Sequence, residues 1–300
     1  MFWLILVFVL TGVFTGFYLS RIQSIALKRS MGWFVLITLV FSTDRMLIEA
    51  SAFYRMLGIC CVLLGSMKGL VYAEWAGKLR LSLPRYCIFA FCWFGMDVGS
   101  FTTRRQNLSW KSDISIGLCA MLLGLSAAWL VWLLNLRQIL LVFVPLSLAF
   151  HFGALRALKG GLRFAGYPVR TLFPDVFMTQ GIADFWSKRW NVGYSQMMQR
   201  VVFRPIAGLA GKDIGFLAVF VISGVLHELA ITLPVQTGYG LPTAYFALHG
   251  LLVLIEKKSG RSFGKISTLL LVVLPLGWLF PSTFKEEVLL YCLSAFELFS

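Results

Sequence analysis

The sequence predicts an all-α polytopic membrane protein with about eight to ten transmembrane or re-entrant helices. Of its 300 residues, 59% are hydrophobic and only 13% are charged, about half of the roughly 25% that soluble domains carry. The mean hydropathy is +0.82. Several apolar runs approach the ~20 residues that a helix needs to cross a bilayer. No alternation with period two extends over many segments, which argues against a barrel of strands.

The apolar segments, taken in order, divide the chain into one membrane domain, 1–300, with three parts. Helices fill 1–155, a polar and amphipathic cytoplasmic segment follows at 156–213, and further helices fill 214–300. The expected spans are 2–19, 31–43, 55–73, 86–101, 114–134, 138–155, 214–234, 241–255, 266–280 and 287–299. The second, eighth and last are short, so we expect them to be tilted, broken or re-entrant, which is tolerated where protein or water surrounds the backbone.

The formal net charge of +14 does not indicate nucleic-acid binding, because Lys and Arg collect in the cytoplasmic loops of membrane proteins. Segment 156–213 holds nine such residues and 256–265 holds four, whereas 235–240 holds none. We therefore place 156–213 and 256–265 in the cytoplasm. The membrane would be the endoplasmic reticulum in a eukaryote or the inner membrane in a bacterium. Basic loops also attract anionic headgroups or an anionic cosubstrate.

The N-terminal half fits this rule less cleanly. Loops 20–30, 74–85 and 102–113 each carry three basic residues. They cannot all be cytoplasmic unless some segment between them fails to cross. The region 31–53 is the first suspect, because Asp44, Arg45 and Glu49 interrupt it.

The most informative polar residue is His227, which lies with Glu228 inside the apolar run 216–233. Ionisable groups at membrane depth usually face a bundle interior or a cavity and mark function. The alternatives are a core histidine bonded to a neighbouring helix and, for Glu228, a partner for an arginine. His249 is a second buried imidazole. His151 has no polar companion before Arg156, so we interpret it as a core residue.

The second informative stretch is 184–191, which is dense in tryptophan and cations. If 182–200 is one helix, Asp184, Lys188, Asn191 and Ser195 share a stripe, and Asp184 and Lys188 form an i,i+4 pair. Such an amphipathic helix lies in or under the membrane interface. The alternative is an anchor in which tryptophan and arginine contact only the membrane.

Four motifs in this order carry a family resemblance. They are FWSKRWN (185–191), Arg204-Pro205, SGVLHE (223–228), and FALHG (246–250) with Glu256 six residues further on. Together they resemble the wax-synthase branch of the membrane-bound O-acyltransferases. The resemblance covers about 180–256. Lys188 stands where the family often has Gly or Arg, and 300 residues is short for this superfamily.

The resemblance implies that an acyl group passes from acyl-CoA to a hydroxyl inside a tunnel through the membrane. By it, His227 is the catalytic histidine and Asn191 its partner. A histidine near neutral pKa can take the proton of an attacking alcohol, and an amide can donate to the developing oxyanion. Supporting roles fall to Ser223 at i−4, which could orient the imidazole, and to Glu228, Asp184, Trp190 and His249.

The implied cosubstrate is acyl-CoA, with no tightly bound cofactor and no metal. We expect basic side chains to receive its anionic moiety, namely Lys188, Arg189, Arg200 and Arg204. The other substrate would be a lipophilic alcohol, such as a fatty alcohol, sterol, terpenoid or diacylglycerol, that enters from the membrane lipids. The rival interpretations are a transporter that uses the buried His and Glu, and a non-catalytic membrane scaffold. A transporter would favour internal repeats, and the sequence has none that we detect.

Overall fold

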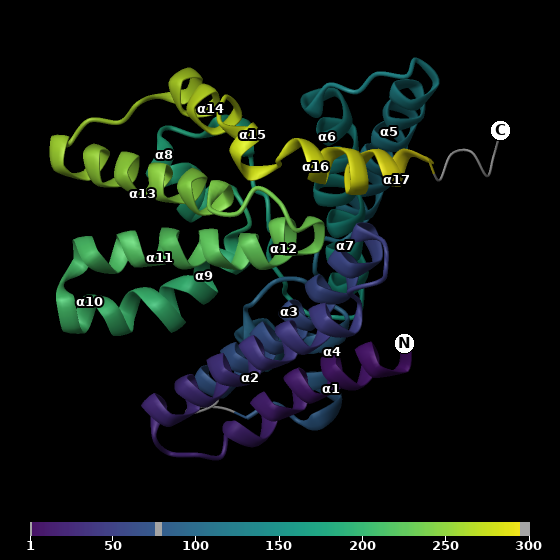
Figure 1. Ribbon diagram of the computed structural model, residues 1–300. Helices are drawn as coiled ribbons and strands as arrows, with labels where there is room; N and C mark the ends of the chain where they lie inside the picture. Colours follow the sequence, from purple (N-terminus) through teal and green to yellow (C-terminus); the bar gives the residue numbers. More distant parts are fainter. Residues whose placement is uncertain (1, 76–79, 295–300) are drawn as a thin grey trace.

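The computed structural model describes residues 2–75 and 80–294, and within these ranges every regular element is a helix (Figure 1). The N-terminal part contains α1 (Phe2–Leu19), α2 (Ile25–Met46), α3 (Ala52–Trp75), α4 (Leu83–Phe91), α5 (Lys111–Leu133), α6 (Ile139–Ser147) and α7 (Leu155–Phe164). The middle contains α8 (Ile182–Asp184), α9 (Val192–Met198) and α10 (Arg204–Ala210). The rest contains α11 (Lys212–His227), α12 (Leu233–Val235), α13 (Leu241–Ser259), α14 (Lys265–Val273), α15 (Leu276–Leu279), α16 (Ser282–Phe284) and α17 (Leu290–Ser294).

Within the described residues, π-helical turns join several pairs of α-helices. These turns are Leu148–Ala154, Phe185–Arg189, Gln199–Phe203, Glu228–Thr232 and Lys285–Leu289. The first joins α6 to α7, and the fourth joins α11 to α12, so each of these pairs forms one continuous span. π-helical turns are rare and occur frequently at functional sites.

The protein is an integral multi-pass membrane protein. Within the described residues, six helices are long and apolar enough to cross a bilayer, and a seventh span results if 265–294, bent by 82°, counts as one. The all-α polytopic prediction is confirmed. The number is below eight to ten because the expected spans 86–101 and 241–255 differ from an apolar crossing helix, and because 266–280 and 287–299 form at most one bent span within the described residues. The C-terminal end of the expected span 287–299 lies outside the described residues.

The expected span 86–101 does not form one continuous helix. α4 has only nine residues, and the chain then breaks before the short 3-10 turn Val98–Phe101, where Asp97 accepts the Gly99 N–H. Nine helical residues reach about 14 Å, which is too short to cross. The expected span 241–255 lies in α13, whose last turn carries the charged residues Glu256, Lys257 and Lys258.

The short α4 also explains how the three basic N-terminal loops could all lie on one side of the membrane. α2 and α3 are both long and apolar enough to cross, so we expect the loops before and after this pair on one side of the membrane. Because α4 is too short to cross, we expect loop 102–113 on the same side. The suspicion about 31–53 is wrong: its Asp44 accepts a 2.5 Å ion pair from Arg55 of α3, so buried charges neutralise each other between two spanning helices.

Small residues let the N-terminal helices approach closely. Gly12 and Gly16 of α1 face Ser66 and Gly69 of α3 so tightly that a Cβ at either α1 glycine would overlap α3. In a membrane, where apolar burial does not drive association, such contacts hold helices together. α5 and α7 are joined by charge instead: Asp113 accepts Lys159 Nζ at 2.8 Å.

The C-terminal helices are layered on the other side of the molecule, with α10, α11, α13 and α14 stacked one over another (Figure 1). Gly224 of α11 packs against Thr243 of α13, and Gly250 of α13 packs against Phe220 of α11. The segment 156–213 is not a surface loop. It folds into the protein, where residues such as Ile182 and Met198 are completely buried.

Candidate functional site

The three parts of the chain enclose one large cavity of about 1230 Å³. Its wall comes from α3, the 139–164 span, the middle segment, α11, α13 and the α14–α15 region. Most of the lining side chains are apolar. The polar groups that face it include His227, Asn191 and His151. An apolar cavity with a few convergent polar groups is the ordinary form of a ligand site.

His227 is the last residue of α11, directly before the π-helical turn Glu228–Thr232. Its Nδ1 lies 2.6 Å from the carbonyl oxygen of Ser223. A carbonyl only accepts hydrogen bonds, so this contact assigns the proton to Nδ1 and leaves Nε2 as a proton acceptor. Ser223 therefore orients the imidazole, but through its backbone, since its hydroxyl donates to the Val219 carbonyl at 2.7 Å.

Asn191 lies where the expected helix 182–200 breaks. Its backbone is left-handed, with φ of 42°, a conformation that asparagine tolerates better than most residues. Its Oδ1 accepts the N–H of Tyr194 at 3.2 Å and begins α9. The amide nitrogen makes no hydrogen bond with any residue the structure describes and remains available as a donor at the cavity wall. The predicted single helix, and with it the continuous stripe, is therefore wrong.

The tryptophans of the middle segment belong to the cavity wall and are more than membrane anchors. The Trp190 ring lies 5.0 Å from Phe173 and stacks on Phe185 at 5.7 Å. Trp186 lies 5.4 Å from Phe246, whose ring is 4.3 Å from His227. The segment 185–191 thus forms an aromatic frame that fixes where Asn191 stands relative to α11 and α13.

Glu228 follows His227 directly in sequence but has a structural role. Its Oε1 accepts the backbone N–H groups of Gly240 at 3.0 Å and of Thr243 at 3.1 Å, and its Oε2 accepts the Thr232 hydroxyl at 2.6 Å. Glu228 therefore caps the N-terminus of α13, where a carboxylate is favoured. Neither the expected arginine partner nor contact with the imidazole occurs among the described residues.

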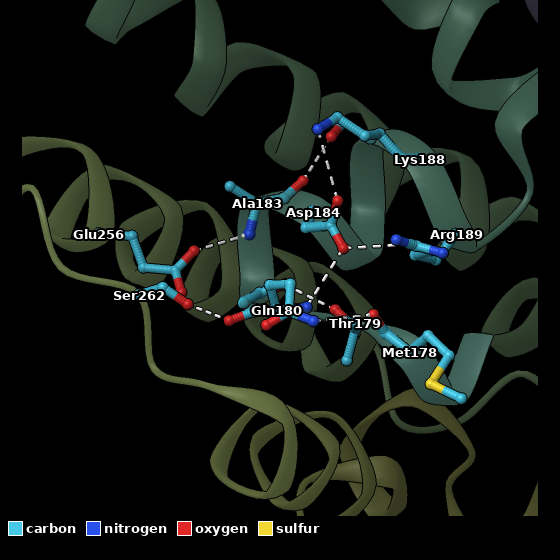
Figure 2. Close-up of polar contacts among 11 residues, drawn as sticks. Met178, Thr179, Gln180, Ala183, Asp184, Lys188, Arg189, Glu256 and Ser262 are labelled. Atoms are coloured by element: carbon cyan, nitrogen blue, oxygen red, sulfur yellow. Dashed lines mark hydrogen bonds and ion pairs between the residues drawn. The ribbon is translucent and has the colours of Figure 1, made fainter. Parts of the chain in front are cut away.

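Glu256, in the last turn of α13, also accepts backbone N–H groups, one of which, from Ala183, is drawn in Figure 2. It accepts the N–H groups of Ile182 at 3.1 Å, Ala183 at 2.8 Å and Phe263 at 2.9 Å. The start of the 182–191 segment is thereby fastened to α13. Sequence reasoning quoted Glu256 as part of a motif without giving it a role. The sequence signal for such a role is an acidic residue directly before Lys257 and Lys258 at the end of an apolar helix.

His249 is held by the same kind of contact as His227 but lies away from the cavity. Its Nδ1 is 2.7 Å from the Tyr245 carbonyl, and its ring packs against Trp186 at 5.3 Å. The side chain is 0% exposed and does not line the cavity. It supports the site only indirectly, through Trp186.

Comparison with known proteins agrees with the motif order. Residues 169–248 match the family model described as "Membrane bound O-acyl transferase family". The chain is 25% identical over 142 residues to "Probable long-chain-alcohol O-fatty-acyltransferase 2" of Arabidopsis thaliana, which covers 41% of each protein. It is 25% identical over 240 residues to "Putative long-chain-alcohol O-fatty-acyltransferase 10" of the same plant, which covers 73% of this chain and 68% of the relative.

A third relative is "Long-chain-alcohol O-fatty-acyltransferase" of Simmondsia chinensis, 23% identical over 93 residues, or 28% of this chain and 26% of the relative. The chain resembles the membrane-bound O-acyltransferase family, whose model matches residues 169–248 of its 300 residues. The resemblance is to its wax-synthase-like branch. Two of the three matches cover less than half of the relative's length. The family match contains the aromatic frame, Asn191 and His227, and it ends one residue before His249.

The cations expected to receive a cosubstrate lie outside the cavity lining. Asp184 accepts Arg189 Nε at 3.1 Å and pairs with Lys188 at 3.5 Å (Figure 2), so the i,i+4 pair is confirmed. Burial raises the pKa of the Asp184 carboxyl, but the Gln180 N–H and Arg189 lower it more, and its pKa lies below the ordinary value. Asp184 thus partly neutralises two of the four cations.

Arg200 and Arg204 also do not line the cavity. Among the described lysines and arginines, Lys257 in the last turn of α13 does line it. Its Nζ lies 3.1 Å from the centre of the Phe216 ring near the start of α11. This position is at the end of α11 that adjoins the basic middle segment, since Phe216 lies only about one turn after the start of α11 at Lys212. Sequence reasoning counted Lys257 among the loop charges without assigning it to the site.

Proposed function

We propose that this protein is an O-acyltransferase that moves an acyl group from acyl-CoA to the hydroxyl of a lipophilic alcohol. The observation that carries the proposal is the His227 imidazole, whose Nδ1–H is held by Ser223 while the ring faces a large apolar cavity. The names of the relatives support a fatty acyl group and an alcohol as substrates.

In the proposed reaction the alcohol oxygen attacks the thioester carbonyl while Nε2 of His227 takes the hydroxyl proton. A new C–O bond forms, and the carbonyl oxygen becomes an oxyanion. When the tetrahedral intermediate collapses, the C–S bond breaks and the proton on Nε2 passes to the thiolate. The products are an ester and free coenzyme A, and no acyl-enzyme is required.

Asn191 would contribute its amide nitrogen. The group is a hydrogen-bond donor at the cavity wall, and its backbone is fixed by the start of α9. A fixed donor aimed at the developing oxyanion stabilises the transition state more than the ground state. The aromatic frame of Trp186 and Trp190 excludes water from this part of the wall, which strengthens each electrostatic contact.

The anionic part of the donor would enter beside Lys257. Phe216, under the Lys257 ammonium, lies eleven residues before His227 on α11, or about 16 Å at the helical rise of 1.5 Å per residue. With the thioester at His227, the coenzyme A moiety would therefore point toward the cytoplasm and the acyl chain would lie among apolar side chains. Lys188, Arg189, Arg200 and Arg204 remain predicted outer contacts of the same anion.

The acceptor alcohol would reach the cavity from the bilayer. A fatty alcohol fits the names of the relatives most directly, and a sterol, terpenoid or diacylglycerol would share its apolar body and single reactive hydroxyl. The membrane, whether the endoplasmic reticulum or a bacterial inner membrane, supplies this substrate.

The test is acyl transfer by purified protein in nanodiscs. Radiolabelled acetyl-, octanoyl- and palmitoyl-CoA are each incubated with 1-dodecanol, a sterol and diacylglycerol, and the neutral esters are separated. Labelled ester from the wild type, absent with His227→Gln, is the expected result. His249→Gln is the matched control, because it alters a histidine with the same backbone contact outside the cavity. Full activity in folded His227→Gln would refute the mechanism.

A further inference from the structure

His151 faces the same cavity as His227, contrary to its interpretation as a core residue. It lies in the π-helical turn Leu148–Ala154, and Ser147, one turn earlier, also lines the cavity. The Ser147 hydroxyl is 2.9 Å from His151 Nδ1. The polar companion is upstream of the histidine, whereas sequence reasoning looked only downstream.

The position of His151 relates it to the proposed site. Its ring lies 4.9 Å from Phe173 and 5.7 Å from Trp190, the residue directly before Asn191. On the other side of the same segment, Tyr194 lies 6.3 Å from His227. Residues 190–194 therefore run between the two histidines, with Asn191 among them.

The two imidazoles also lie at similar depth along their helices. The 139–164 span ends, and the 212–235 span begins, at the basic middle segment. His151 is thirteen residues from Phe164, and His227 is fifteen from Lys212, so each is about 20 Å along its helix from that segment. Two hydrogen-bonding sites thus face an otherwise largely apolar cavity at one level.

The hydrogen-bonding capacity of His151 is incomplete. Ser147 occupies Nδ1, and Nε2 makes no hydrogen bond with any residue in the ranges 2–75 and 80–294. A polar group kept in apolar surroundings without a partner is costly, typically by more than a net hydrogen bond contributes. The His227 and Asn191 side chains already provide for the reacting hydroxyl and oxyanion, so the His151 imidazole is free to bind another oxygen.

We propose that His151, held by Ser147, binds a second oxygen of the acceptor alcohol and so sets which alcohols are preferred. The favoured substrate class is an apolar alcohol that carries a further hydroxyl or ester oxygen at some distance along its chain from the reacting one, in preference to a simple long-chain alcohol. This inference rests on the proposed function in taking the ligand of the cavity to be an alcohol. His151 acts on specificity and does not take part in bond making.

The experiment measures binding without any acyl donor. Tritiated 1,8-dodecanediol, whose hydroxyls are separated along the chain, and 1-dodecanol, equal in chain length and lacking one hydroxyl, are titrated onto the purified full chain in nanodiscs. The variants are His151→Phe, which keeps the ring contacts with Phe173 and Trp190, and Ser147→Ala, which removes only the hydroxyl that holds the imidazole. Val144→Leu changes the same wall without polarity and is the control.

We expect the wild type and Val144→Leu to bind the diol about five- to tenfold more tightly than the mono-alcohol, the value of one hydrogen bond. His151→Phe should abolish that preference and leave 1-dodecanol binding within about twofold, and Ser147→Ala should reduce it. His151→Gln, which restores a hydrogen-bonding group, should recover part of it. Equal weakening for both ligands, or no preference in the wild type, overturns the inference, and if His151→Phe fails to fold, Ser147→Ala decides.

The result is separable from the proposed function. If the wild type binds the diol through His151 but transfers no acyl group, the proposed transferase function is refuted and the oxygen site at His151 is supported. If the protein is an active transferase without a His151-dependent preference, the oxygen site is refuted and the proposed function is supported.

Discussion

His227 and His249 are held in the same way and differ in what they face. Each imidazole places Nδ1 near the carbonyl four residues earlier in its own helix, at 2.6 Å for His227 and 2.7 Å for His249. His227 lines the large cavity, whereas His249 is completely buried behind Trp186. The backbone contact prepares a proton acceptor in both, but only one can meet a substrate. Access to the cavity therefore separates the reactive residue from the structural one.

The largest expected effect tests this difference directly. His227→Gln should lower kcat for ester formation about 10²–10⁴-fold, the usual contribution of a general base, without loss of the folded protein. His249→Gln should lower kcat less than tenfold but destabilise the fold by about 1–3 kcal/mol, because a buried group loses its partner. Single-turnover ester formation and thermal unfolding in detergent measure the two. Equal loss of kcat in both would show that cavity access is not the distinguishing property.

Asn191 allows a sharper substitution at the cavity wall. Asn191→Asp keeps an oxygen for the Tyr194 N–H, and therefore the start of α9, but removes the amide donor. We expect kcat to fall about 10²-fold, in the range found when one oxyanion donor is removed, with an unchanged unfolding temperature. Asn191→Gly, which keeps the left-handed backbone and loses both contacts, should fall as far in kcat and also lose stability. Wild-type kcat in the aspartate variant would show that the amide does not serve the oxyanion.

These contrasts also show how far the sequence goes. The composition and apolar runs were enough for an all-α membrane protein, and intramembrane polarity was enough to single out His227. The break at Asn191 was not visible, because a left-handed residue inside an apparent helical stripe is chosen by the packing of the aromatic frame. His151 and Lys257 were missed as cavity residues, since the cavity wall comes from helices far apart in sequence.

Glu228, which contacts the start of α13, and Glu256, in its last turn, extend the comparison to groups that do not face the cavity. Glu228 and Glu256 each accept backbone N–H groups of a neighbouring helix start. Glu228→Gln and Glu256→Gln should each lower the unfolding free energy by about 1–3 kcal/mol. Only Glu256→Gln should also reduce kcat, by about three- to tenfold, because Glu256 fastens the segment that bears Asn191. A loss of kcat with Glu228→Gln as large as with His227→Gln would contradict its structural role.

The smallest expected effect concerns the cations, which also differ in whether they line the cavity. Lys257 lines the cavity, whereas Lys188 lies outside it and pairs with Asp184. Lys257→Met should raise the KM for acyl-CoA about three- to tenfold with little change in kcat, and Lys188→Met should change KM less than twofold. Because the Lys257 charge is partly exposed, the effect should shrink as ionic strength rises and the Debye length falls from about 10 Å at 0.1 M to about 3 Å at 1 M salt. A larger effect at Lys188 would move the entry of the anionic donor to the Asp184 cluster.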